Sequence, residues 1–352
     1  MTEKILFDRI GDWGVVTLNN ERALNALDWE MVTAMRAQLT GWASDPGVHA
    51  VMVKANGEKA FCAGGDIRWL HDTAKTDPDQ ACEFFRDEYS NNVLIHHYPK
   101  PYVAMIDGIV MGGGVGISVH GDFRVAGERS LFAMPETGIG LFPDVGGGAF
   151  LPSLDGGLGF YFGLTGARAK AGDCVGAGVA THFVETDKQT DLISSLLDTK
   201  LTGDAHDIIA GLLDGASTPQ ADARIHGLRA EIDQFFEAPQ SLESLLDELE
   251  KSDTEFASKT LATLRAMSPT SLRITFEQLK QGARLSFNQV MEMEYRVVCR
   301  VMRGKDFFEG VRAQILDKDR NPQWSPDSLD GVSDEDIAAY FEPLGERELV
   351  LG

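Results

Sequence analysis

The sequence predicts a layered α/β fold over residues 1–200, followed by a mainly helical region over residues 201–352. Two observations predict it. Strand-like and helix-like segments alternate through the first half, which is typical of sheets covered by helices. Beyond residue 200 several segments have apolar residues at helical spacing, so this part is expected to be mainly α-helical. With 43% hydrophobic residues in 352 positions, the chain can bury a sizeable core.

The first elements follow from hydrophobic spacing. Residues 5–10 and 13–20 alternate in polarity and predict two strands of a hairpin. A helix is predicted over 27–44, where apolar residues recur three and four positions apart and Asp28 stands near the start. An apolar strand is predicted over 49–56.

A second cycle repeats this order. A helix is predicted over 79–98, where prolines follow its end, and a buried strand over 102–110. Two short strands are predicted within 123–136. Later helices are predicted within 191–201, 230–237, 241–252, 258–267 and 271–303, and an acidic, turn-rich surface segment over 317–344.

The net charge of −22 argues against a nucleic-acid or anionic-membrane partner, because it repels phosphate. No apolar run is long enough for a membrane helix. The four cysteines lie far apart, which favours a reducing compartment, and the N-terminus has no leader pattern, so we expect a cytosolic protein. No cluster has metal-ligand spacing, and neither a dinucleotide fingerprint nor a phosphate loop is present.

Two glycine clusters follow predicted strands, "FCAGGDI" at 61–67 and "DGIVMGGGVGIS" at 107–118. Peptide N–H groups at a strand-to-helix turn have no intrahelical acceptor and can point at one oxygen. Two such groups would form an oxyanion hole. The alternative for each cluster is a tight turn with close packing of helix on sheet.

The segment "MPETGIGLFPDVGGGAF" at 134–150 places Glu136 and Asp144 in apolar, glycine-rich surroundings. These acids could serve in proton transfer or nucleophilic attack. The alternatives are a helix N-cap for Asp144 and a surface acid at a strand end for Glu136. Glu88, taken alone, fits the solvated face of an amphipathic helix, and Asp66 fits a helix cap.

In this order and spacing, "KAFCAGGDI", "PYVAMIDGIVMGGGVGIS" and "FAMPETGIGLFPDVGGGAFLPSL" resemble the enoyl-CoA hydratase/isomerase (crotonase) superfamily. The motif "MPETGIGLFPDVGGG", with "SPTSLRITFEQL", "MEYRVVCRVM" and "DFFEGVRAQILDKDRNPQW", is similar to the 3-hydroxyisobutyryl-CoA hydrolases within it. The resemblance implies a crotonase-like spiral of ββα units over 1–200 and helices covering an acyl pocket over 201–352.

The resemblance also implies roles for single residues. The N–H groups of Gly65 and Gly113 would form the oxyanion hole for a thioester carbonyl. Glu136 would act as nucleophile or as general base, and these two routes stay open. Asp144 would bind the substrate hydroxyl and assist proton transfer, and Glu88 would contact the substrate.

The residue at 116 separates the chemistries within the superfamily. Hydratases of this superfamily carry one catalytic glutamate just after the oxyanion glycines, where this chain has Gly116. The resemblance therefore favours hydrolysis of a short branched 3-hydroxyacyl-CoA thioester, such as 3-hydroxyisobutyryl-CoA in valine breakdown. The alternatives are an enoyl-CoA hydratase or isomerase and a non-catalytic acyl-CoA-binding protein.

The expected partner is an acyl-CoA substrate, whose phosphates would need local cations or N–H groups against the overall charge. No cofactor is expected beyond the CoA of the substrate, and no metal. The superfamily often forms homo-oligomers, and a homo-oligomer is one possible assembly here. The alternative is that the helical C-terminal region covers the surface that such assemblies use.

Overall fold

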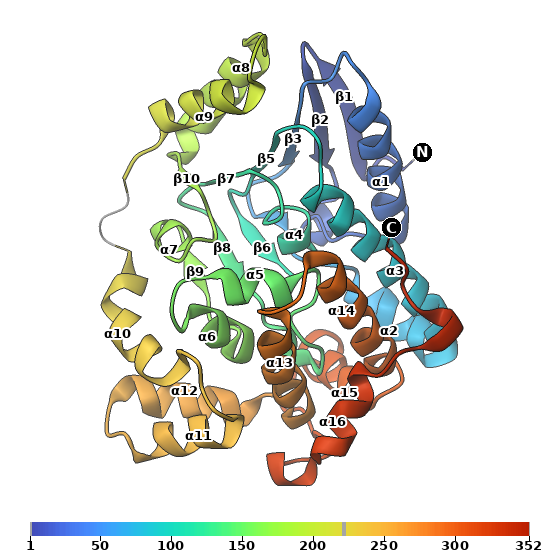
Figure 1. Cartoon of the computed structure of the whole chain (residues 1–352), viewed down its shortest axis with the longest axis vertical. Helices are drawn as coiled ribbons and strands as arrows, with labels where there is room; N and C mark the ends of the chain where they lie inside the picture. Colours follow the sequence, from blue (N-terminus) through green and yellow to red (C-terminus); the bar gives the residue numbers. More distant parts are fainter. Residues whose placement is uncertain (1, 220–222, 352) are drawn as a thin grey trace. The chain divides into compact units, whose positions relative to one another are not determined.

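The computed structural model describes residues 2–219 and 223–351, and the chain forms two compact units (Figure 1). Each unit combines segments that are distant in the sequence. The first unit consists of Met1–Gly65, Ser90–Phe132 and Arg168–Gly227, and the second of Asp66–Tyr89, Ala133–Ala167 and Leu228–Gly352. The predicted division at residue 200, into a spiral core and a helical region that covers an acyl pocket, stays a prediction. The two compact units divide the chain by a different criterion, the compactness of each part.

The first unit contains a six-stranded sheet with the order β1-β2-β3-β5-β7-β10. The predicted hairpin is confirmed, since β1 and β2 pair antiparallel, and the remaining neighbours run parallel. Parallel neighbours need crossover segments, as the alternating pattern predicts. The strands are β1 Ile5–Ile10, β2 Trp13–Leu18, β3 Ala50–Ala55, β5 Tyr102–Met105, β7 Phe123–Ala126 and β10 His182–Phe183.

A second sheet has the order β4-β6-β8-β9. The prediction of one strand over 102–110 is wrong, because this stretch forms β5 and β6 in two different sheets. The chain turns between them at Gly108, which has a φ of +123° that other residues rarely adopt. The strands are β4 Ala60–Cys62, β6 Ile109–Met111, β8 Leu131–Ala133 and β9 Ala169–Lys170.

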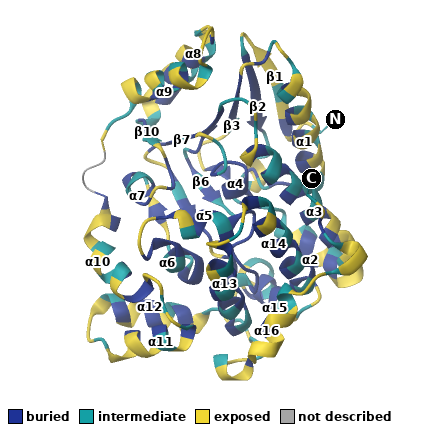
Figure 2. Cartoon of the chain, in the orientation of Figure 1, coloured by how far each residue is buried: buried dark blue, intermediate teal, exposed yellow. Residues whose placement is uncertain are grey.

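The core of the first unit lies between the six-stranded sheet and the helices α8 (Thr186–Asp198) and α9 (Ala205–Ala216). Alternate residues of the strands, such as Trp13 and Val15, supply one face of this core because successive strand side chains point to opposite faces. The indole of Trp13 also donates to the carbonyl of Leu196 at 2.9 Å. Figure 2 shows buried strands beside helices whose outer faces are exposed.

Helix α1 (Trp29–Ser44) packs on the other face of this sheet, where a Cβ at Gly14 would lie 2.5 Å from the ring of Trp42. Asp28, which stands near the start of the predicted helix, caps α1, because its carboxylate accepts from the N–H of Met31 at 2.9 Å.

The second unit is mainly helical. The predicted helical run over 271–303 consists of two helices, because the chain breaks before Ser286, whose hydroxyl caps the second. The helices and turns are α2 Ile67–Thr76, η2 Glu136–Ile139, α5 Gly147–Ser153, α6 Leu158–Thr165, α11 Leu242–Lys251, α12 Glu255–Ala266, α13 Pro269–Gly282, α14 Phe287–Val301, α15 Asp306–Val311 and α16 Asp334–Phe341. Two of the unit boundaries fall inside α3 (Pro78–His96) and α10 (Arg224–Phe236), and a third falls inside β8.

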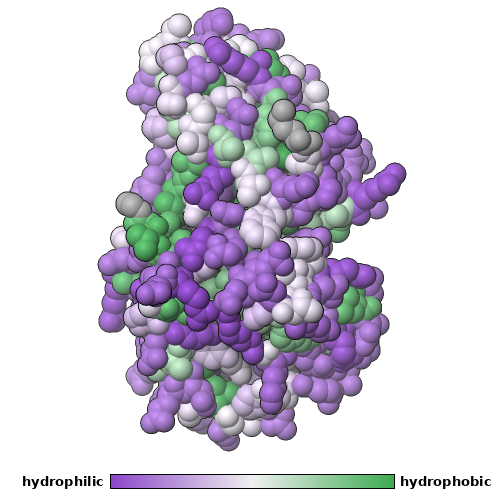
Figure 3. Space-filling view, turned by 90° about the vertical axis from the view of Figure 1, so that its right-hand side faces the viewer, coloured by the Kyte–Doolittle hydropathy of each residue, from purple (hydrophilic) through white to green (hydrophobic). Residues whose placement is uncertain are grey.

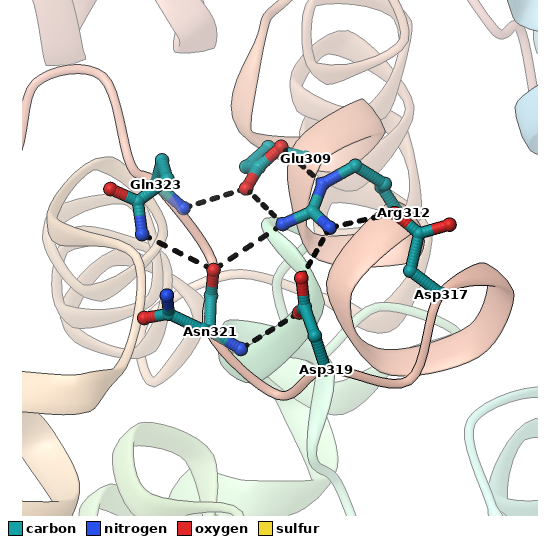
Figure 4. Close-up of polar contacts among 6 residues, drawn as sticks. All are labelled: Glu309, Arg312, Asp317, Asp319, Asn321 and Gln323. Carbon is teal, nitrogen blue, oxygen red and sulfur yellow. Dashed lines mark hydrogen bonds and ion pairs between the residues drawn. The ribbon is translucent and has the colours of Figure 1, made fainter.

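An arginine holds the turn-rich segment that follows α15 (Figure 4). The guanidinium of Arg312 donates to Glu309 and Asp317 at 2.8 Å and to Asp319 at 2.6 Å. Glu309 also accepts from the backbone N–H of Gln323 at 2.7 Å. One exposed ion pair contributes little, but this network ties the segment at several points.

Hydrophilic residues dominate the face shown in Figure 3, and hydrophobic residues form smaller groups among them. Large apolar side chains that are exposed within the described residues are Leu6, Ile10 and Val350. Across 2–219 and 223–351, none of the helices combines the length and the apolar character that crossing a membrane would need.

We expect Gly108→Ala to lower the free energy of unfolding by about 2 kcal/mol or more, because of its φ and because a Cβ there would lie 2.9 Å from Cα of Ala60. Gly41→Ala is the matched control. Gly41 is exposed in α1 with nothing near its Cβ, so this change should raise the free energy of unfolding by about 0.5–1 kcal/mol. Urea unfolding followed by circular dichroism measures both, and a G108A variant as stable as the wild type would contradict the turn geometry.

Candidate active site

Two glycine loops of the first unit lie together and present backbone N–H groups. Leu27 donates its N–H to the carbonyl of Gly64 at 2.8 Å, and Gly65 forms an isolated parallel bridge with Leu27. A Cβ at Gly64 would lie 3.8 Å from the amide nitrogen of Gly113, the first residue of α4 (Gly113–Gly116). Within the described residues, no protein acceptor pairs with the N–H of Gly65 or of Gly113. Both amides are therefore available to a ligand oxygen.

Close packing also requires glycine in the second loop. A Cβ at Gly114 would lie 2.3 Å from the carbonyl oxygen of Cys62 in β4, so any side chain would push α4 away from the sheet. Thus the packing role and the presentation of free N–H groups coexist in one loop. Gly116 ends the same short helix and is buried, and it carries no carboxylate.

Glu136 lies in the second unit, at the first position of the turn η2 that follows β8. Its side chain is buried with 5% of the residue exposed, so a surface location is excluded. Burial raises the pKa of Glu136 well above its usual range, and the charge of Asp144 adds to this effect. In the part of the chain that the structure describes, Oε2 of Glu136 has no hydrogen-bond partner. This carboxyl oxygen is therefore available to a substrate.

Asp144 is buried and bonded to a tyrosine of the same unit. The hydroxyl of Tyr89 donates to Oδ2 of Asp144 at 2.8 Å. Burial raises the pKa of Asp144 to about 7, and the Tyr89 bond opposes this rise. The alternative role as helix cap is wrong, because α5 begins at Gly147 and its N-cap is Gly146, without a side-chain cap.

Glu88 stands beside Tyr89 on α3 and is only 3% exposed, so its assignment to a solvated face is wrong. Burial raises the pKa of Glu88 well above its usual range, and the charge of Asp144 raises it further. Among the described residues, Oε1 of Glu88 has no hydrogen-bond partner. Asp66, by contrast, is a cap as predicted, since it accepts from the N–H of Trp69 at 3.0 Å.

The second unit thus brings Glu88, Glu136 and Asp144 close enough together for the charge of Asp144 to raise the pKa of both glutamates. Like charges this deeply buried do not all ionise near neutral pH, so at least one carboxyl group can hold a proton while another accepts one. Gly65 and Gly113 belong to the first unit, where the described geometry leaves their N–H groups free.

Sequence reasoning missed three polar residues of this cluster: Tyr89, Gln278 and Glu294. All three are buried, and Glu294 is 0% exposed. Glu294 stands on the face of α14 that also carries the buried residues Val290 and Val298, one turn before and one turn after it. An acid in an apolar helical stripe is the pattern that could have revealed it.

The comparisons extend over nearly the whole chain. A family model described as enoyl-CoA hydratase/isomerase matches residues 13–341. A 3-hydroxyisobutyryl-CoA hydrolase from Danio rerio is 48% identical over 353 residues, covering 99% of this chain and 92% of the relative. The enzyme of that name from Homo sapiens is 45% identical, with 99% and 90% covered.

Two solved structures share the fold at full length. A carnitinyl-CoA dehydratase from Mycobacterium thermoresistibile superimposes with a TM-score of 0.92 at 35% identity, covering 99% of each chain. An enoyl-CoA hydratase from Rhodobacter sphaeroides gives a TM-score of 0.90 at 38% identity, covering 99% of this chain and 100% of the other. The predicted crotonase fold is thereby confirmed.

The expected cytosolic location is wrong, because the curated relatives are mitochondrial proteins. Within the described residues the four cysteines are buried and form no disulfide. Free thiols are compatible with more than one reducing compartment, so cysteine usage could not identify which one.

The family match, the identities of 45–48% to full-length relatives and the shared fold agree with the motif resemblance. This chain belongs to the enoyl-CoA hydratase/isomerase family.

Proposed function

We propose that this protein hydrolyses a short branched 3-hydroxyacyl-CoA thioester, with 3-hydroxyisobutyryl-CoA as the first substrate to test. The observation that carries the proposal is the pair of buried acids, Glu136 and Asp144, together with a glycine at 116. The names of the relatives at 45–48% identity support the same activity.

In the proposed reaction the N–H groups of Gly65 and Gly113 bind the carbonyl oxygen of the thioester. Negative charge develops on this oxygen during attack, and removing one oxyanion-hole donor costs about 3–4 kcal/mol in other enzymes. Neither amide has a protein acceptor within the described residues, which supports this role.

Glu136 drives the attack by one of two routes. As nucleophile, its carboxylate oxygen bonds to the carbonyl carbon while the C–S bond breaks, and water then hydrolyses the mixed anhydride. As general base, it takes a proton from the water that attacks directly. In both routes the CoA thiolate leaves and is protonated. A single turnover in ¹⁸O-labelled water identifies the nucleophile route when water attacks the Glu136 carbonyl of the anhydride, because ¹⁸O then enters the Glu136 carboxyl group. The general-base route places ¹⁸O in the product and none in Glu136.

Asp144 and Glu88 are proposed to contact the acyl group. Oδ2 of Asp144 accepts a hydrogen bond from Tyr89, and the other carboxyl oxygen is proposed to bind the substrate hydroxyl. A pKa of about 7 lets this group give or take a proton. The unpartnered Oε1 of Glu88 supports a second polar contact to the substrate. We propose no cofactor beyond the CoA of the substrate.

A hydratase is the second candidate, because the structural relatives at 35–38% identity are named a dehydratase and a hydratase. Loss of ultraviolet absorbance from an enoyl-CoA, without release of CoA, would support hydration instead. A protein that binds acyl-CoA tightly but turns over none of a substrate panel would be the non-catalytic alternative. Assembly into a homo-oligomer stays a prediction.

Glu136→Gln should lower kcat for CoA release from 3-hydroxyisobutyryl-CoA by about 10³-fold or more, because the amide neither attacks nor accepts a proton. A thiol reagent measures the released CoA. Glu248→Gln, at an exposed position of α11, is the matched control and should keep full activity. A fully active E136Q variant would remove Glu136 from the mechanism.

Asp144→Asn should raise the melting temperature at pH 8, and the gain should shrink towards pH 5. The folded protein raises the pKa of Asp144 from 3.8 to about 7, so it binds more protons than the unfolded chain in this window. The stability from this group is therefore present at acid pH and is lost as the pH rises through about 7. Asn cannot ionise and avoids this loss.

Calorimetry at both pH values measures the effect, with Asp247→Asn on the exposed side of α11 as control. A D144N variant that is less stable than the wild type by the same amount at both pH values would contradict the predicted titration.

A further inference from the structure

Glu294 is a fully buried acid whose two carboxyl oxygens both bind the backbone beside Asp144. The N–H of Gly146 donates to Oε2 of Glu294 at 2.8 Å, and the N–H of Gly148 donates to Oε1 at 2.8 Å. The acceptor comes from α14 and the donors from the start of α5, two elements that are far apart in the sequence. One side chain therefore fixes two peptide groups of the segment 143–148, which we call the Asp144 segment.

Gln278 of α13 fixes the other end of this segment. Its Nε2 donates to the carbonyl oxygen of Pro143 at 2.6 Å and to Oε1 of Glu294 at 2.9 Å. Gln278 is 0% exposed, so these bonds form away from water. Together the two side chains hold the backbone immediately before Asp144 and two to four residues after it.

The Asp144 segment needs outside support because of its backbone conformation. Val145 has a φ of +52° and Gly146 a φ of +86°. The left-handed region is unfavourable for a β-branched residue and persists only when the surroundings enforce it. The N–H groups of Gly146 and Gly148 also lie where a helix start has no internal acceptors, and α5 has no side-chain cap of its own.

A contribution to folding stability alone does not explain why the buried position 294 carries an acid. Burial raises the pKa of Glu294 to about 8 while the two glycine N–H groups oppose the rise, so the fold keeps an ionisable group where desolvation is costly. An apolar side chain would fill the same space at lower cost, but it would accept no hydrogen bond. What a carboxyl group adds is two acceptor oxygens in a fixed geometry, one for each glycine N–H.

We propose that Glu294, assisted by Gln278, is a positioning residue that holds the backbone of Asp144 so that its carboxyl group meets the substrate. The inference rests on the proposed role of Asp144 in thioester hydrolysis. Tyr89 holds Oδ2 of the Asp144 carboxyl group, and Glu294 holds the peptide groups that carry it. Glu294 acts through Asp144 and touches no reacting atom.

The first test measures backbone protection without any reaction. Glu294→Gln presents an amide N–H₂ to one of two N–H donors, so peptides that contain Gly146 and Gly148 should exchange hydrogen at least tenfold faster in E294Q than in wild type. Val298→Ala is the matched control, since Val298 is buried one turn further along α14 and does not bond to the segment. V298A should lower the melting temperature without speeding exchange there.

The second test measures kinetics with 3-hydroxyisobutyryl-CoA. E294Q should lower kcat by about 10²-fold with KM changed less than about threefold, because a misplaced group loses rate more than binding. Glu294→Asp keeps two acceptors and should recover part of kcat, whereas V298A should keep kcat. In the D144N background, E294Q should have almost no further effect, because both changes remove the same group from its place.

The inference is overturned if E294Q keeps the wild-type kcat, or if it lowers kcat as much in D144N as in wild type. A wild-type protein that releases no CoA would overturn the proposed function instead. In that case the exchange data decide the inference: faster exchange at Gly146 and Gly148 supports positioning, and unchanged exchange overturns it.

Discussion

The second unit depends on one constraint, that the backbone polar groups around Asp144, in a short buried segment with a strained conformation, need hydrogen-bond partners. A buried polar atom without a partner costs about 1–3 kcal/mol, and a buried charge costs more. Three helices meet this demand, since α3 contributes Tyr89, α13 contributes Gln278 and α14 contributes Glu294. The packing of these helices on the Asp144 segment is therefore fixed by hydrogen bonds as well as by apolar contacts.

Glycine makes these contacts sterically feasible. A Cβ at Gly282 would lie 2.0 Å from the carbonyl oxygen of Gly148, so α13 approaches α5 this closely because Gly282 lacks a side chain. The same reasoning holds in the first unit, where Gly114 lets α4 lie against Cys62. Backbone groups can bind a neighbour or a ligand only at hydrogen-bond distance, and glycine permits that approach.

Several features of the site could be predicted because they depend on local sequence. The apolar flanks of Glu136 indicated burial, and the glycines around 64 and 113 indicated free peptide N–H groups. The interpretations of Asp144 as a cap and Glu88 as a solvated residue were wrong for a common reason. Each interpretation considered only the helix or turn that contains the residue, whereas the burial of a side chain depends on the elements that pack against it. The strand predicted over 102–110 failed because the turn at Gly108 is hidden in a continuous apolar run.

The sequence by itself determined the α/β architecture, the family and the acids of the candidate site, because hydrophobic spacing, glycine clusters and motifs are local patterns. Only the tertiary structure decided which groups hold those acids. The bond from Tyr89 to Asp144 spans 55 positions, that from Gln278 to Pro143 spans 135, and that from Glu294 to Gly146 spans 148. No periodicity relates residues so far apart, since their contact is set by how the helices pack.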